Sequence, residues 1–293
     1  RFFQAIGACA GIVIARAVVR DLYTPQASAR VFSFLILVMG VAPILAPLFG
    51  NYVTEWFGWR AIFWIVSVLG VACAFVIHLV LPETRGRRYD VRMRHSGRTY
   101  WDVLKDRSFL RYSLTGGIAQ AGLFAYITGS PLMFIELFDF TPSAYSWLFG
   151  ANAVGIIGFS QLNGWLLKYY PARKILNVSL PILAVVSVGM AVAAYVKAPV
   201  WGILVPLFAY ISTLGLVFPN AMAGALANQQ ERAGSASAVT GSLQFLIAGL
   251  VSMGVNSVSG LTDYAMAWVI GSTGIIAVVT YRLMRYEEPE SAA

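Results

Sequence analysis

Arg1 places a permanent positive charge in an apolar segment, where it forms the pattern R-x-x-Q-x-x-G with Gln4 and Gly7. Arg16 lies 15 residues further along, so at about 1.5 Å per residue Arg1 sits about 22 Å deeper in the same helix. A guanidinium at such depth is costly unless it faces an aqueous cavity or the bundle interior, and charged residues there mark ion or substrate pathways. The alternative is a frayed helix end, or a side chain that reaches back to the interface.

A second pattern, G-x-x-P-x-x-x-P-x-x-G, comprises Gly40, Pro43, Pro47 and Gly50. Each proline removes a backbone donor and clashes with the preceding turn, whereas the glycines permit close helix approach. The pattern therefore predicts a bent and tightly packed helix.

Polar and aromatic side chains in the second half of the chain, after residue 108, are candidate contacts for a bound substrate. Helix interruptions are expected at residues 129–131, which contain Gly129 and Pro131, and near residues 218–220, which contain Pro219. Interrupted helices are tolerated only against protein or an aqueous cavity. Such a lining suits bulky amphipathic drugs better than ions. The alternative for each residue is hydrogen bonding between helices. The candidate cavity residues are Gln120, Tyr126, Ser130, Pro131, Asn152, Phe218, Asn220 and Gln244.

Other chemistries find little support in the sequence. The two cysteines, Cys9 and Cys73, lie in apolar runs, so neither a disulfide framework nor a cysteine-based zinc site is expected. No nucleophile elbow, P-loop or dinucleotide fingerprint occurs. We therefore expect no catalytic residues, no metal, no cofactor and no enzymatic activity.

These residues must be positioned by membrane-spanning helices. The chain has 293 residues, 58% of them hydrophobic and 12% charged, with a mean hydropathy of +0.71, which a soluble domain of this length would not tolerate. Runs of about 20 apolar residues, enough to cross a bilayer, recur nine times. They span Phe2–Leu22, Val31–Val53, Ala61–Leu81, Leu110–Phe138, Trp147–Leu167, Ile175–Val196, Val200–Leu226, Ala236–Val258 and Ala265–Leu283.

Basic residues orient these spans. When alternate loops are placed on one side, that side holds 18 of the 21 Lys and Arg residues. The positive-inside rule makes this side cytoplasmic, with the C-terminus there too. The net charge of +8 is then a topology signal, and a nucleic-acid partner loses its support.

A basic loop divides the chain unequally. Residues 1–81 hold three spans, residues 82–108 form the predicted cytoplasmic loop, and residues 109–293 hold six spans with a short tail. Transporters built from repeated halves would have six spans on each side, so we expect about three helices to be missing ahead of Arg1. Within the loop, residues 100–106 alternate between apolar and charged, which favours an amphipathic helix on the membrane surface or, equally, a solvated linker.

At this point the chain resembles a known family. The pattern at Arg1 is similar to motif B of the major facilitator superfamily, and the Gly/Pro helix to motif C of its drug:proton antiporters. The segments R-F-F-Q-A-I-G-A, A-P-I-L-A-P-L-F-G, F-G-W-R-A-I-F-W, Y-I-T-G-S-P and P-N-A-M-A resemble the Bcr/CflA multidrug efflux family, which includes bicyclomycin-resistance proteins. The resemblance implies the major facilitator fold, an all-α polytopic membrane protein, with nine of twelve helices present, the fourth to the twelfth.

The resemblance also implies a function. It implies proton-driven efflux of drugs or other small amphipathic molecules across the bacterial inner membrane, with Arg1 in proton transfer and the Gly40–Gly50 bend sealing the two halves. The expected partners are a drug-like molecule, protons and membrane lipid, and the expected state is a monomer. The family's intramembrane aspartate and its motif A precede the region matched here, so these 293 residues alone are not expected to couple protons. A metabolite transporter of the same fold, for a sugar or organic acid, is the alternative.

Overall fold

The computed structural model describes residues 7, 45–46, 49–81, 96–229 and 233–284. The chain separates into two compact units, Arg1–Arg92 and Met93–Ala293, which are described one at a time. The division between them falls within the predicted central loop.

In the first unit, the described part is a helical segment at residues 49–57 followed by helix α3, Trp59–Val80. Gly58 separates them with a φ of 77°, a left-handed conformation that favours glycine because it has no Cβ. Helix α3 corresponds to the third predicted span. Arg1, Gly40, Pro43 and Pro47 lie outside the described residues, and Gly50 lies in the 49–57 segment, so the predicted bend remains a prediction.

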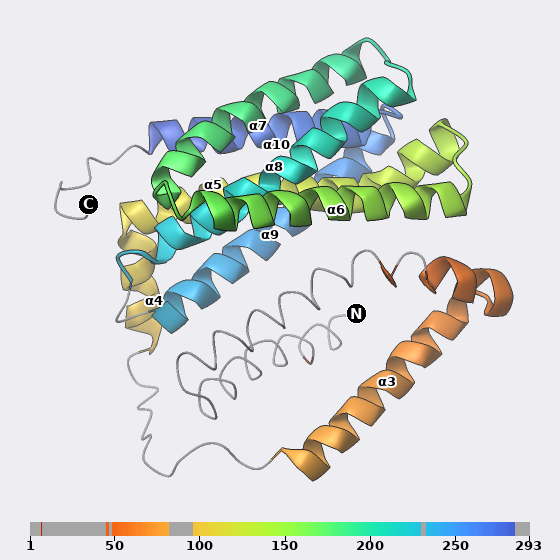
Figure 1. Cartoon of the computed structure of the whole chain (residues 1–293), viewed down its shortest axis with the longest axis horizontal. Helices are drawn as coiled ribbons and strands as arrows, with labels where there is room; N and C mark the ends of the chain where they lie inside the picture. Colours follow the sequence, from red (N-terminus) through yellow and green to blue (C-terminus); the bar gives the residue numbers. More distant parts are fainter. Residues whose placement is uncertain (1–6, 8–44, 47–48, 82–95, 230–232, 285–293) are drawn as a thin grey trace. The chain divides into compact units, whose positions relative to one another are not determined.

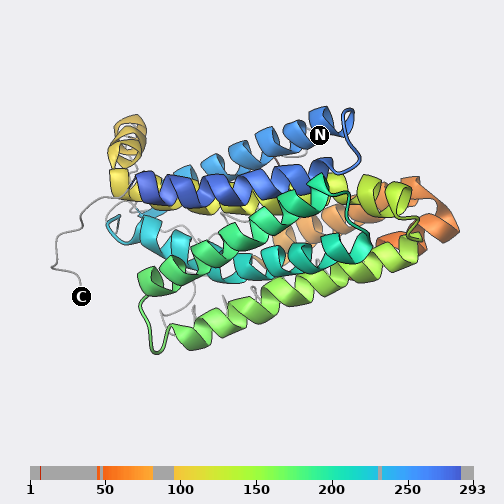
Figure 2. The ribbon, with the colours of Figure 1, turned by 90° about the horizontal axis from the view of Figure 1, so that it is seen from above.

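The second unit is a bundle of six long helices preceded by a short one (Figures 1 and 2). The short helix occupies part of the predicted loop, and the long helices follow the six predicted spans, two of which begin and end at the predicted residues. Among the described residues there is no β-strand, as expected for an all-α protein. The elements are α4 (Ser96–Lys105), α5 (Arg107–Pro131), the π-helix η2 (Leu132–Leu137), α6 (Pro142–Leu166), α7 (Ala172–Tyr195), α8 (Val200–Leu226), α9 (Ala233–Ser259) and α10 (Ala265–Leu283).

Two helix starts show how the sequence sets these bounds. Asp106 precedes α5, and its carboxylate accepts hydrogen bonds from the backbone N–H groups of Ser108 and Phe109 at 2.8 and 3.1 Å. Thr141 precedes α6, accepts from the Ala144 N–H at 3.2 Å, and is followed by Pro142 at the first helical position. Both arrangements satisfy N–H groups that have no partner within a helix.

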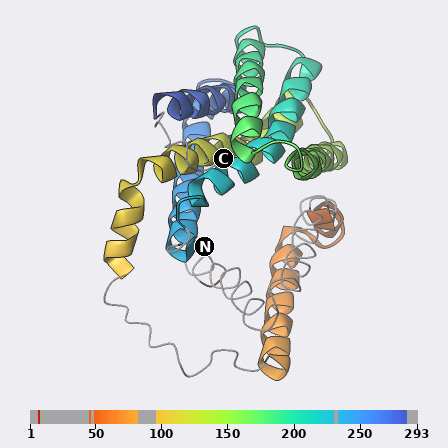
Figure 3. The ribbon, with the colours of Figure 1, turned by 60° about the vertical axis from the view of Figure 1, so that its left-hand side comes forward.

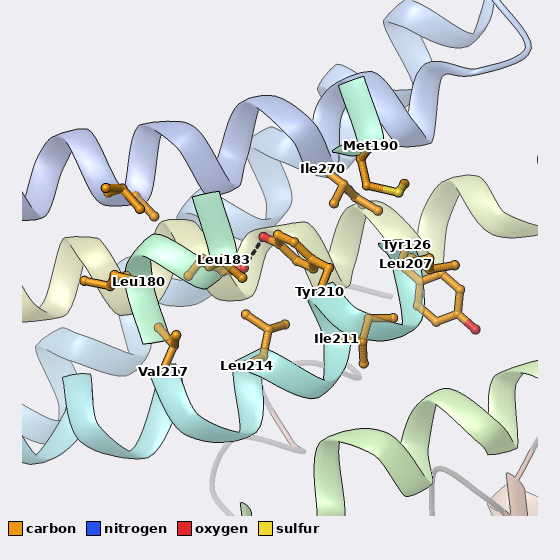
Figure 4. Packing of buried hydrophobic residues seen from close by; sticks show 14 of the residues in the cluster. Tyr126, Leu180, Leu183, Met190, Leu207, Tyr210, Ile211, Leu214, Val217 and Ile270 are labelled. Carbon is orange, nitrogen blue, oxygen red and sulfur yellow. Dashed lines mark hydrogen bonds between the residues drawn. The ribbon is translucent and has the colours of Figure 1, made fainter. Parts of the chain in front are cut away.

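Helices α5 and α8 form the centre of the bundle. Helix α5 packs against α8, α9 and α10, while α8 also packs against α6 and α7. Tyr210 of α8 is fully buried, and its hydroxyl donates to the Ala119 carbonyl of α5 at 2.8 Å and lies 3.4 Å from the Thr273 hydroxyl of α10 (Figure 4). One phenol therefore joins three helices at the core.

Six of the described helical segments are long and apolar enough to cross a membrane. They include α3, α5 with η2, α7, α8, α9 and α10. Helix α6 has 25 residues and is long enough to span, but its Ser, Asn, Gln and Gly residues lower its apolar content. A polytopic helical membrane protein is confirmed.

The predicted break near Phe218, Pro219 and Asn220 is wrong, because α8 continues through all three. Pro219 has no backbone N–H, so it cannot donate the usual helical hydrogen bond to the Gly215 carbonyl one turn earlier. The Ser160 hydroxyl of α6 reaches that carbonyl at 3.4 Å, and a neighbouring hydroxyl of this kind is how membrane helices tolerate an internal proline.

The predicted interruption at residues 129–131 is also corrected. Helix α5 runs through Gly129 and Ser130 to Pro131, and the chain then continues as η2 with the wider hydrogen-bonding pattern of a π-helix. The Phe138 N–H, for example, donates to the Met133 carbonyl at 3.1 Å. The helix changes pitch after Pro131 and does not stop, and π segments of this kind occur frequently at functional sites.

Candidate functional site

Three predicted cavity residues lie in one group between α5 and α6, together with two that sequence reasoning missed. We call this group the α5–α6 aromatic cluster; it contains Tyr126, Ser130, Tyr145, Phe149 and Asn152. The rings of Tyr126 and Phe149 stack with centroids 5.2 Å apart and an angle of 22°. The Asn152 amide N–H donates to the Tyr126 hydroxyl at 3.2 Å, and the Ser130 and Tyr145 hydroxyls lie 2.8 Å apart.

The local helical register explains why these side chains meet. Tyr126 and Ser130 are one turn apart on α5, and Tyr145, Phe149 and Asn152 recur at three- and four-residue spacing on α6. Tyr126, Ser130 and Asn152 are each at most 2% exposed. Tyr145 and Phe149 could have been found in the sequence, since they share the helical face of Asn152.

The cluster has unused hydrogen-bonding capacity. The Asn152 Nδ2 also donates to the Leu148 carbonyl at 3.1 Å, whereas the buried Asn152 Oδ1 has no hydrogen-bond partner among the described residues. An unpaired buried carbonyl costs about 1–3 kcal/mol. The cluster therefore holds one unpaired buried acceptor beside a stacked pair of rings, of which Phe149 is partly exposed.

Asn220 lies elsewhere, in a pair with Asn163. The Asn220 Nδ2 donates to Asn163 Oδ1 at 2.5 Å and to the Leu216 carbonyl at 2.7 Å, and both asparagines are at most 3% exposed. Asn163 and Asn152 are eleven positions apart on α6, which at the rise of an α-helix is about 16 Å. The predicted residues thus fall into at least two separate polar groups. Asn163 is an amide in an apolar run, like Asn152, and the same reasoning could have identified it.

The remaining candidates show no shared contact. Gln120 is half-buried, and its Oε1 has no hydrogen-bond partner among the described residues. Gln244 is half-buried on α9 beside Gly117 of α5. Phe218 is half-buried on α8, and Pro131 is exposed at the end of α5. Their role in a cavity remains a prediction.

Hydrogen bonding between helices explains part of the polar content of α9. The Thr240 and Ser113 hydroxyls lie 3.1 Å apart, and the Thr128 hydroxyl donates to Ser252 at 3.1 Å. Both pairs join α5 to α9. Small hydroxyl residues commonly stabilise membrane bundles in this way.

Arg111 is a buried charge whose partner the sequence did not reveal, although it lies just inside the predicted span Leu110–Phe138. It lies on α5 and is 4% exposed. Its Nε donates to the Tyr281 carbonyl of α10 at 3.0 Å, and its guanidinium lies 3.9 Å from the centre of the Tyr281 ring. A cation over an aromatic face that also binds a carbonyl in the last turn of a helix stabilises the contact between α5 and α10.

Among the described residues, no three His, Cys, Asp or Glu side chains come together as a metal ion would require. The described acids are exposed or half-buried, so none lies within the bundle core.

Comparison with known proteins shows which family and which relatives this chain is similar to. A family model described as "Major Facilitator Superfamily" matches residues 1–253. YdgK of Bacillus subtilis, described as an uncharacterized MFS-type transporter, is 31% identical over 94% of this chain and 70% of its own length.

Two further relatives carry names that refer to drug resistance. A "Bicyclomycin resistance protein homolog" of Haemophilus influenzae is 26% identical over 96% of this chain and 71% of the relative. A "Multidrug resistance protein MdtL" of Klebsiella pneumoniae is 26% identical over 98% of this chain and 74% of the relative. The resemblance to the bicyclomycin-resistance group is thus confirmed at modest identity.

A solved structure shares the fold. The inward-facing, unoccupied crystal structure of a bacterial homolog to the human lysosomal transporter Spinster gives a TM-score of 0.58 at 16% identity, covering 92% of this chain and 72% of that one. At this identity the similarity shows the fold alone.

Proposed function

The chain belongs to the major facilitator superfamily, and from that premise we propose that it exports small amphipathic, drug-like molecules across the bacterial inner membrane in exchange for protons. The relatives named for bicyclomycin and multidrug resistance support the direction of transport and the substrate class. The Gly/Pro pattern of residues 40–50, which resembles the antiporter motif, supports exchange over uptake.

The observation that carries the substrate class is the α5–α6 aromatic cluster. Stacked rings take up flat apolar molecules of varied shape, while a few polar groups orient them. The Tyr126–Phe149 stack and the unpaired Asn152 Oδ1 supply both properties. A molecule with a flat apolar body and a hydrogen-bond donor fits this combination.

Proton coupling rests on the sequence. The described residues contain no buried acid, and we propose that the protonatable group of the cycle lies outside them. Arg1, in the motif B pattern, is the residue that we propose links protonation to transport. Transport itself would follow alternating access around a midplane site, in a monomeric multi-pass protein with a cytoplasmic C-terminus and no enzymatic activity.

The test uses everted membrane vesicles energised by respiration, with a pH-sensitive dye and a panel of antibiotics and amphipathic dyes. The protein is produced with any coding sequence that precedes Arg1 in its gene. Proton release from the vesicle lumen on adding a drug, lost in Arg1→Ala, is the expected result. If no compound of the panel causes proton release although the protein is inserted, drug:proton antiport is refuted and a metabolite transporter is favoured. Uptake of labelled sugars and organic acids would then identify the metabolite.

Matched variants test the site. Asn152→Ala removes the buried amide and should change the resistance profile across the panel. Asn256→Ala removes an exposed amide from α9 and should leave the profile unchanged. Equal profiles for Asn152→Ala and the wild type would show that the cluster does not contact substrate.

A further inference from the structure

Helix α4 is a short amphipathic element at the end of the bundle where α5 begins. Figures 1 and 2 show α4 running across the direction of most bundle helices, and Figures 1 and 3 show it beside the start of α9. Val103 is fully buried, and α4 packs against both α5 and α9. Residues 100–105 are therefore part of a docked helix, as the amphipathic pattern of residues 100–106 predicts, and are not a solvated linker.

The opposite face of α4 is exposed and carries an aromatic and a basic residue. Trp101 and Lys105 are four residues apart, and each is two residues from Val103, so they point about 160° away from it around the helix. Trp101 is 60% exposed, and the Lys105 ammonium lies 5.5 Å from the centre of its ring. An exposed indole is costly in bulk water but favourable at a membrane–water interface.

Chain connectivity fixes the depth of this face. Helix α4 ends at Lys105 and the spanning segment α5–η2 begins at Arg107, with only Asp106 between them. The end of α4 must therefore lie at the boundary of the membrane. Both oxygens of the Asp106 carboxylate already accept hydrogen bonds within the protein, one from the start of α5 and one from the Gln229 amide at 2.6 Å. Lys105 and Arg107 are exposed, so the outward charge here is positive.

We propose that the Trp101–Lys105 face of α4 binds anionic phospholipid headgroups. The indole would lie at the headgroup level, and the ammonium would pair with lipid phosphate. Positive charge concentrated on the predicted cytoplasmic side complements the anionic lipids of that leaflet. This lipid site goes beyond the proposed transport function and does not depend on it.

The test measures contact between Trp101 and lipid in nanodiscs that hold the whole protein. Nanodiscs contain either brominated phosphatidylglycerol or brominated phosphatidylcholine at the same mole fraction, with bromine near the headgroup. The Trp101 contribution to quenching is the part lost in Trp101→Phe. We expect stronger quenching by the anionic lipid, and Lys105→Gln should reduce that preference about fivefold, the factor for one Lys near an anionic leaflet.

Two controls make the result specific. Lys105→Arg keeps the charge and should keep the preference. Trp147 of α6 is 67% exposed and no Lys or Arg occurs between Arg111 and Lys168, so the quenching lost in Trp147→Phe should show no preference for anionic lipid. Should Lys105→Gln fail to fold, high salt applied to the wild type must abolish the preference instead, because it screens surface charge.

Several outcomes would overturn the proposal. Equal quenching of Trp101 by the two lipids would show that charge does not select the partner. An absence of quenching by either lipid would show that water or another part of the protein covers this face. A preference of equal size at Trp147 would show a general effect of lipid composition, unrelated to α4.

Discussion

Replacing Gly215 with alanine should separate α6 from α8. A Cβ at this position would collide with the Ile156 carbonyl, and it would lie 2.8 Å from the Ser160 backbone nitrogen and 3.0 Å from the Phe159 Cβ. Two of these three neighbours are backbone atoms, which cannot rotate away, so the helices must move apart. Overpacking of this kind costs about 1–3 kcal/mol.

The control is a second Gly→Ala substitution in a packed helix, at a position where the added Cβ meets no close neighbour. Gly189 lies in α7, which also packs on α8, and a Cβ there would meet only the Pro206 Cβ at 3.9 Å, an ordinary contact. Gly189→Ala should therefore be neutral or stabilise the protein by up to about 1 kcal/mol, because alanine favours a helix over glycine. Both variants add one methyl group to a helix at the α8 packing surfaces, and only the group at position 215 collides with a neighbour.

Thermal unfolding in detergent, followed by tryptophan fluorescence, measures the difference. We expect Gly215→Ala to lower the Tm by at least about 2 °C, using the dependence of Tm on stability for domains of this size. The resistance profile should change as well, since separation of the helices would move Asn152 and Asn163 of α6. Equal Tm values for Gly215→Ala and Gly189→Ala would refute the close approach of α6 to α8.

Three further substitutions test other contacts. Arg111→Lys should lower the Tm because an ammonium cannot both stack on the Tyr281 ring and bind its carbonyl as the guanidinium does; an unchanged Tm would contradict the buried contact. Tyr210→Phe removes the hydrogen bond to the Ala119 carbonyl and should cost about 0.6–1.7 kcal/mol in unfolding titrations, whereas Tyr195→Phe, at a side chain 78% exposed, should cost nothing; equal costs would refute the core role. Asp106→Ala should cost about 0.5–2 kcal/mol and accelerate hydrogen exchange at the Ser108 and Phe109 amides, which the carboxylate holds; unchanged exchange would argue against the cap.

Much of the second unit could be predicted because its helices follow simple physical rules. The bounds of α8 and α10 match the apolar runs at both ends, since polar turns begin where the hydrocarbon core ends. The start of α6 was predicted five residues late, at Trp147 instead of Pro142. The Thr–Pro cap there fixes the helix start independently of hydropathy.

The errors came from contacts between distant residues. Pro219 satisfies every local criterion for a break, but Ser160, from another helix, supplies the donor that the Gly215 carbonyl lacks. Arg111 lies at the start of a predicted span, as a charge at the membrane interface would, and its burial depends on the position of the end of α10. The site divided into separate groups for the same reason, because spacing along one helix does not indicate which neighbour each side chain faces.

The contact between Arg111 and the end of α10 links two helices of the bundle. The Arg111 side chain holds Tyr281 in two ways, by a hydrogen bond to its carbonyl and by lying over its ring. Whatever rearrangement accompanies transport, α5 and α10 should travel together at this end as one rigid body.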